Sequence, residues 1–167
     1  MSFHAKPTTF VSHVKIKVEN LDRSLSFYKD LLGFEILEQS QSNKTAHLTT
    51  DGKTTILSLE QPKDVKPKQY KTTGLYHFAI LLPKRSHLAL IVQHLVQNGI
   101  RFGSSDHLVS EALYFDDPDG NGIEIYVDRD PSEWEWNSGS VNMTVDPLNF
   151  EDLMQTATQG EKWTKMP

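Results

Sequence analysis

Two histidines and one glutamate occupy corresponding places in this sequence and have the chemistry of metal ligands. His13 and His77 each stand at the start of a run of alternating apolar residues, and Glu124 lies between Ile123 and Ile125 in a third run. Because side chains alternate along a strand, all three should point away from the face that carries the β-branched residues. Two imidazoles and one carboxylate that meet in a cleft form a facial triad, which suits Fe(II), Mn(II) or another divalent ion and leaves coordination positions open.

The composition narrows the choice of ligands. An unpaired buried carboxylate is costly unless it is paired or binds a cation, so Glu124 needs a partner. The sequence has no cysteine, which excludes disulfides and thiolate metal sites and leaves histidine, carboxylate or water as ligands. A single histidine at the start of a strand is usually an ordinary surface or core residue. The repeated position and common phase of His13 and His77 set them apart from the other histidines.

The elements that must position these residues occur twice in the same order. In the first set we expect a strand at 12–18 and a helix at 21–32, which Asn20 caps and Gly33 ends. Three further strands are expected at 34–37, 44–50 and 54–60. In the second set we expect a strand at 76–82 and a helix at 86–98, which Ser86 caps and Gly99 ends. A strand at 100–103 and a closing hairpin at 112–128 follow. Such a repeat predicts two pseudo-symmetric β-α-β-β-β modules and an α+β fold.

The predicted organisation is one domain over residues 11–128 followed by an arm. Module one spans 11–60, a proline- and lysine-containing linker spans 61–74, and module two spans 75–128. Residues 129–167 form a tryptophan-containing C-terminal arm with a short amphipathic helix near 149–158. The arm is either a packing element with a frayed end or a linker to a second domain beyond this sequence.

Charge and hydropathy exclude several classes of function. The formal net charge of −5 without a basic stripe argues against nucleic-acid binding. There is neither a signal peptide nor an apolar run long enough to span a membrane, so we expect a cytoplasmic protein without a membrane partner.

A histidine opens each module, and residues 117–124 read Asp-Pro-Asp-Gly-Asn-Gly-Ile-Glu. With the paired modules, these features resemble the vicinal oxygen chelate superfamily of glyoxalase I, extradiol dioxygenases, fosfomycin-resistance enzymes and bleomycin-binding proteins. The resemblance implies a half-open mixed-sheet barrel with helices outside and a divalent metal held by His13, His77 and Glu124. Glyoxalase I has a fourth ligand on the last strand of its first module, where this chain has Ser58, so the resemblance to that enzyme is weaker.

A second set of residues resembles the extradiol dioxygenase signature. His107, the pair Leu113-Tyr114, the pair Asp117-Pro118, Gly120 and Glu124 follow its order, and Ser105 departs from it. The chain as a whole is similar to the N-terminal half of two-domain catechol-2,3-dioxygenase-like proteins of Gram-positive bacteria, in which the arm leads into a second pair of modules.

The resemblance implies an extradiol dioxygenase-like enzyme that acts on a small aromatic diol with O2. Fe(II) would be the metal, with Mn(II), Zn(II) or Ni(II) as alternatives, and His107 and Tyr114 would hydrogen-bond the substrate. Such enzymes also carry an acid–base histidine shortly before the second metal histidine, and residues 61–76 contain none. Two alternatives stay open: another metal-dependent isomerase, lyase or thiol transferase, and a small-molecule-binding resistance protein without turnover. A homodimer is the assembly that the resemblance allows.

Overall fold

The computed structural model describes residues 9–69 and 71–167. The chain divides into two compact units, one ending at Thr72 and including Met166, the other running from Thr73 to Lys165 and including Pro167. Each unit has its own mixed four-stranded sheet and its own helix along the chain between its first two strands.

The first unit has the strand order β1-β4-β3-β2. Its strands are β1 (Val14–Lys17), β2 (Glu35–Ser40), β3 (Thr45–Thr49) and β4 (Leu57–Glu60). The edge strand β1 is parallel to β4, and the other neighbours are antiparallel. Ile16 is buried while Lys15 and Lys17 are exposed, which confirms the alternation predicted for this strand.

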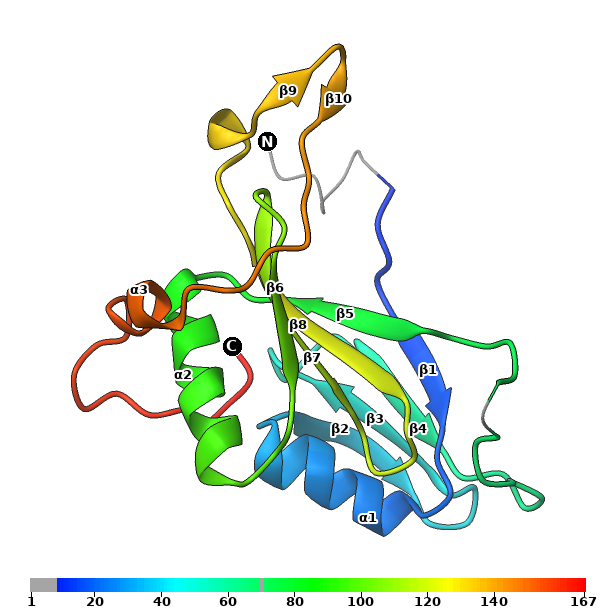
Figure 1. Ribbon diagram of the computed structural model, residues 1–167. Coiled ribbons are helices and arrows are strands. Elements are labelled where there is room, and N and C mark those ends of the chain that lie inside the picture. Colours follow the sequence, from blue (N-terminus) through cyan, green and yellow to red (C-terminus); the bar gives the residue numbers. More distant parts are fainter. Residues whose placement is uncertain (1–8, 70) are drawn as a thin grey trace. The chain divides into compact units, whose positions relative to one another are not determined.

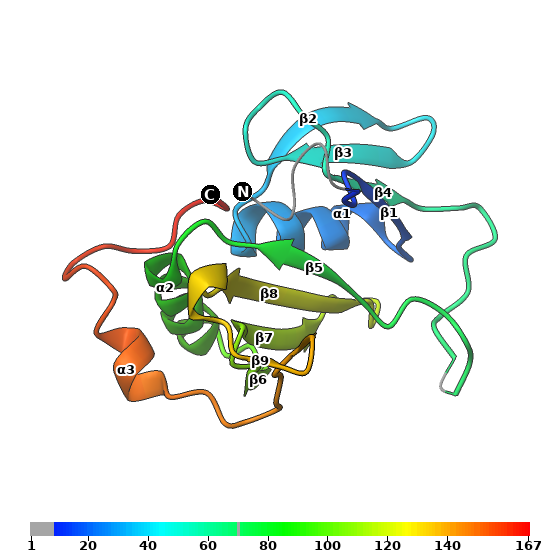
Figure 2. The same cartoon turned by 90° about the horizontal axis from the view of Figure 1, so that it is seen from above.

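One continuous helical segment follows β1 in the first unit. It starts as α1 (Leu21–Leu25) and widens into a π-helix, η1 (Ser26–Leu31), and it lies along one face of the sheet (Figure 2). The Asn20 side chain accepts a hydrogen bond from the Arg23 N–H at 2.9 Å, and Gly33 ends the segment with a φ of 85°. Both predicted helix limits are therefore confirmed.

The second unit repeats this arrangement with the strand order β5-β8-β7-β6. Its strands are β5 (His77–Leu81), β6 (Gly103–Asp106), β7 (Ser110–Asp116) and β8 (Gly122–Asp128). The edge strand β5 is parallel to β8, and the helix α2 (Arg85–Gln97) covers one face of the sheet (Figure 1). Leu88, Ile91 and Leu95 of α2 are fully buried, as are Ile123 and Ile125 of β8, so these residues form the core.

Two predicted limits in this unit are wrong. Ser86 lies inside α2, because the helix begins at Arg85 after Lys84, which makes no side-chain capping hydrogen bond. The strand expected at 100–103 begins only at Gly103. The Ile100 N–H donates to the Leu95 carbonyl at 2.9 Å, so this residue closes the helix end instead of joining the sheet.

The predicted α+β class with two β-α-β-β-β modules is confirmed, and both sheets are open rather than closed barrels. In the second unit Leu113, Ile123 and Ile125 are fully buried, whereas His77, Tyr114 and Glu124 have the opposite strand phase and stay partly exposed. Among the described residues, no helix is long and apolar enough to cross a membrane.

The arm after β8 contains short elements. They are a 3₁₀ turn, η2 (Pro131–Glu133), a two-stranded ribbon of β9 (Trp136–Asn137) and β10 (Ser140–Val141), and the helix α3 (Phe150–Met154). The last of these is shorter than the predicted 149–158. Leu153 and Trp163 are buried, and Asp152 of α3 pairs with Arg85 of α2 at 2.7 Å, which fixes the arm to the second unit.

Candidate functional site

The sheet register of the second unit brings His77 and Glu124 together. In the parallel pair of β5 and β8, His77 lies opposite Gly122 and Ala79 lies opposite Glu124. His77 Nε2 lies 2.8 Å from Glu124 Oε2, and the side chains keep 29% and 14% of their exposure. An imidazole nitrogen and a carboxylate oxygen at this separation are a donor set that fits a divalent cation. Two of the three predicted metal ligands are therefore adjacent.

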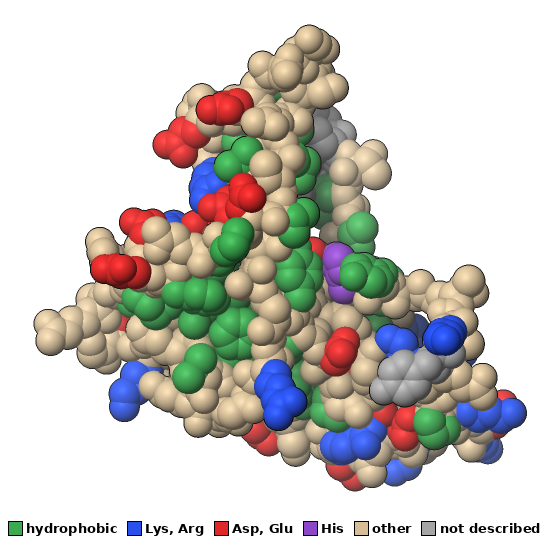
Figure 3. Space-filling view, in the orientation of Figure 1, with side chains coloured by type: hydrophobic (Ala, Val, Ile, Leu, Met, Phe, Trp, Pro, Cys, Tyr) green, Lys and Arg blue, Asp and Glu red, His purple; other side chains and the backbone are tan. Residues whose placement is uncertain are grey.

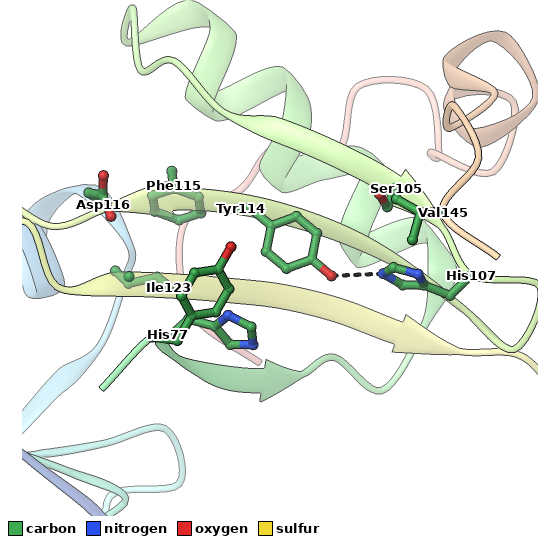
Figure 4. Close-up of a pocket in the computed structure, with 10 residues that line it drawn as sticks. His77, Ser105, His107, Tyr114, Phe115, Asp116, Ile123 and Val145 are labelled. Atoms are coloured by element: carbon green, nitrogen blue, oxygen red, sulfur yellow. Dashed lines mark hydrogen bonds between the residues drawn. The ribbon is translucent and has the colours of Figure 1, made fainter. Parts of the chain in front are cut away.

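Tyr114 and His107 continue this pair into a longer network. Tyr114 lies opposite Glu124 in the antiparallel pair of β7 and β8, and its hydroxyl donates to Glu124 Oε1 at 2.8 Å. His107 Nε2 lies 2.8 Å from the same hydroxyl, as the dashed line in Figure 4 shows. The other ring nitrogen, Nδ1, lies 2.7 Å from the main-chain oxygen of Thr144. Four side chains named from the sequence thus form one hydrogen-bonded chain.

The phenol of Tyr114 is held in its neutral form. Burial raises its pKa well above the ordinary tyrosine value, and the hydrogen bond to the Glu124 carboxylate raises it further. Tyr114 therefore acts as a hydrogen-bond donor at neutral pH. Its single proton can serve Glu124 or His107 but not both at once.

A pocket of about 580 Å³ opens beside this network. His77, His107 and Tyr114 supply polar atoms to its wall and Val145 supplies exposed apolar surface, while the buried residues Phe115 and Ile123 also line it (Figure 4). The space-filling view also shows a histidine that reaches the surface among hydrophobic side chains (Figure 3). An apolar pocket with a few convergent polar groups is the usual form of a small-molecule site.

The first unit holds His13 in a similar pattern. Ser58 Oγ lies 2.8 Å from His13 Nε2 and 2.6 Å from His47 Nδ1, and Ser58 is buried. Ser58 pairs with Lys15 on β1, two residues after His13, just as Glu124 pairs with Ala79, two residues after His77.

The third strand completes the correspondence between the units. His47 lies opposite Ser58 on β3, as Tyr114 lies opposite Glu124 on β7. The trio of His13, Ser58 and His47 therefore repeats the register of His77, Glu124 and Tyr114. Sequence analysis did not assign a role to His47; its signal is this position on the third strand of the module.

The facial triad as a whole stays a prediction. His13 belongs to the first unit, whereas His77 and Glu124 belong to the second. In residues 9–69 and 71–167, no cluster of three or more histidine or acidic side chains is gathered as a metal site.

Comparison with known proteins identifies the family. Residues 11–125 match the model of the Glyoxalase/Bleomycin resistance protein/Dioxygenase superfamily. The chain belongs to this superfamily. The predicted resemblance is thereby confirmed, and the glyoxalase/dioxygenase superfamily accounts for the repeated modules described above.

Relatives within the glyoxalase/dioxygenase superfamily differ in their named activities. The chain is 43% identical to a catechol-2,3-dioxygenase of Bacillus subtilis over 161 residues, which cover 95% of this chain and 55% of the relative. It thus spans about half the length of that protein. It is 29% identical to the metallothiol transferase FosB of Staphylococcus saprophyticus over 120 residues, which cover 70% of this chain and 76% of the relative. A glyoxalase/dioxygenase structure from Nostoc punctiforme matches with a TM-score of 0.58 and 27% identity, covering 72% of this chain and 91% of that one.

Proposed function

We propose that this superfamily member is a metal-dependent extradiol dioxygenase, which cleaves an aromatic ring beside two adjacent hydroxyl groups with O2. The observation that carries the proposal is the hydrogen-bonded chain of His77, Glu124, Tyr114 and His107 beside the pocket. The name of the relative from Bacillus subtilis, at 43% identity, supports it.

His77 and Glu124 would hold the metal, with His13 of the first unit as the third ligand. Fe(II) is the ion we expect, and Mn(II), Zn(II) or Ni(II) are the alternatives. When bound, such an ion would supply Lewis-acid chemistry to a chelated diol, and a redox-active ion such as Fe(II) would supply redox chemistry as well, which Zn(II) cannot.

The remaining residues of the pocket would bind and orient the substrate. Tyr76 and Val145 line the pocket, are exposed, and offer apolar surface against which a single aromatic ring can pack. Tyr114, held neutral, donates a hydrogen bond, and His107 can accept a proton at Nε2. The substrate class proposed is therefore a small aromatic diol.

The test is reconstitution with Fe(II) under anaerobic conditions, followed by oxygen and a panel of catechols. A yellow ring-fission product is the expected result, and bound Fe(II) without product from any catechol would contradict the proposal. Consumption of a thiol in the presence of an electrophile would instead favour the transferase activity named for FosB.

Metal stoichiometry tests the ligands separately from turnover. His77→Ala and His13→Ala should each lower the bound metal measured by elemental analysis. His94→Ala on α2 removes an imidazole outside the pocket and serves as the matched control. Full metal content in His77→Ala would show that the ligand assignment is wrong.

A further inference from the structure

The C-terminal arm makes a main-chain contact with the candidate site. His107 Nδ1 lies 2.7 Å from the carbonyl oxygen of Thr144. A carbonyl oxygen only accepts hydrogen bonds, so Nδ1 must carry a proton. In the neutral ring the other nitrogen, Nε2, is then unprotonated. It lies 2.8 Å from the Tyr114 hydroxyl and accepts from it when that hydroxyl turns its single proton from Glu124 to His107.

The contacting part of the arm is fixed along the outer edge of β6. The N–H of Asp106 donates to the Asp146 carbonyl at 2.8 Å, and the N–H of Asp146 donates to the Asp106 carbonyl at 2.9 Å, which forms an antiparallel bridge. The Thr144 N–H donates to the His107 carbonyl at 3.4 Å, and its hydroxyl donates to the Asp146 carboxylate at 2.7 Å. Residues 144–146 are therefore held against the edge of the second sheet by an isolated bridge.

The backbone around His107 is fixed from the other side. Arg129 donates to both carboxylate oxygens of Asp106 at 2.6 Å, and Asp106 accepts from the Leu108 N–H at 2.9 Å. Leu108 has a φ of +67°, a conformation that a leucine adopts only when its surroundings hold it there. The His107 N–H donates to the Ser110 carbonyl at 2.9 Å. Both the ring and the backbone of His107 are thus restrained.

We propose that the main-chain carbonyl of Thr144 positions His107 and fixes its tautomer, so that Nε2 is the unprotonated nitrogen and faces Tyr114 and the pocket. Thr144 is a positioning residue that acts through its backbone. Val145, the next residue, lines the same pocket, so the arm forms part of the site as well as restraining it (Figure 4).

The consequence for catalysis rests on the proposed function. A proton that leaves a bound diol can be taken up by His107 Nε2, the unprotonated nitrogen of a ring that lines the pocket. His107 then becomes an imidazolium whose Nδ1–H still donates to the Thr144 carbonyl. The proton is conserved, and the His107 ring does not need to rotate. This arrangement provides an acid–base histidine in a chain that has none at residues 61–76.

The test is ¹⁵N NMR of the full chain labelled at histidine, at a pH where an ordinary histidine is neutral. His107 is assigned by the resonances that disappear in His107→Gln. The expected wild-type result is a proton on Nδ1. Asp146→Pro removes the N–H that binds the Asp106 carbonyl and should shift the population toward the Nε2–H form, whereas Asp146→Ala keeps both backbone hydrogen bonds and should leave the tautomer unchanged.

Three results would overturn the inference: an Nε2–H tautomer in the wild type, an unchanged tautomer in folded Asp146→Pro, or a shifted tautomer in Asp146→Ala. If Asp146→Pro does not fold, the wild-type tautomer still decides. In the ring-cleavage assay, Asp146→Pro should lower kcat at unchanged metal content. Absence of ring cleavage in the wild type would contradict the proposed function alone, because the tautomer is measured without turnover.

Discussion

Gly122 lies where β8 passes close to β5, and replacing it with alanine should damage both stability and metal binding. A Cβ at Gly122 would lie 2.2 Å from the Tyr76 carbonyl oxygen and 3.1 Å from the His77 Cβ. Real Cβ contacts essentially never fall under 3.0 Å, so the two strands must separate by roughly the 0.8 Å difference. Overpacking of this kind costs about 1–3 kcal/mol of unfolding free energy.

The displacement falls on the backbone that carries a predicted metal ligand. Because changes in the groups that orient metal ligands typically cost about 10- to 100-fold in metal affinity, this displacement of His77 should weaken metal affinity at least about tenfold. Urea unfolding followed by tryptophan fluorescence suits the stability measurement, since Trp134, Trp136 and Trp163 all belong to the second unit. Metal affinity is measured by competition with a chelator.

The matched control is Gly74→Ala. A Cβ at Gly74 would have no other heavy atom within 4 Å, and Gly74 has no positive φ. This change should therefore leave the free energy of unfolding unchanged or raise it by up to about 1 kcal/mol. Equal stability of Gly122→Ala and Gly74→Ala would refute the steric reasoning. Lower stability with unchanged metal affinity would refute the link from Gly122 to His77.

Three further changes test other parts of the second unit. Glu111→Ala should lower the free energy of unfolding by about 2–4 kcal/mol in the same urea assay. The buried Glu111 carboxylate binds the guanidinium groups of Arg85 and Arg129, and these arginine side chains keep about a third of their exposure. A loss below about 1 kcal/mol would contradict this. Tyr114→Phe should bind metal as the wild type does but lose roughly 10- to 100-fold in kcat, measured as oxygen uptake. The reason is the lost hydrogen bond to the Glu124 carboxylate, since hydrogen bonds to charged groups contribute about 1.5–3 kcal/mol. An unchanged kcat would show that Tyr114 has no part in the mechanism. The hydrogen bond from Arg129 lowers the pKa of Asp106 below its usual 3.8, so its contribution to stability is present above that pH and is lost as the pH falls further. Asp106→Asn should therefore flatten the acid side of the stability curve, and an unchanged curve would exclude this contribution.

Much of the fold follows from local patterns in the sequence. Alternation along β1, the cap at Asn20 and the stops at Gly33 and Gly99 are short-range signals, and the structure confirms them. The start of β6 is not predictable in this way. The N–H of Ile100 could donate either to the carbonyl at the end of the helix or to a neighbouring strand. Once the helix has formed, it donates to the Leu95 carbonyl, and β6 starts later.

The candidate site shows the same division. Strand phase alone places Glu124 on one face, and register with β7 and β5 then brings Tyr114 and His77 to it. Thr144 gives no signal, because it acts through a backbone oxygen that every residue type possesses. His47 gives only a weak signal, because its meaning depends on the pairing of β3 with β4.

The shared register of the two trios means that backbone spacing and reactive chemistry are separable in this chain. Ser58 in the first unit and Glu124 in the second occupy corresponding positions, and so do His47 and Tyr114. The strand pairing is the same in both units despite these different side chains. Each half therefore serves as an internal template for redesigning the other. Exchanging Ser58 for glutamate and His47 for tyrosine would transplant an entire donor set while the hydrogen-bond ladders stay as they are.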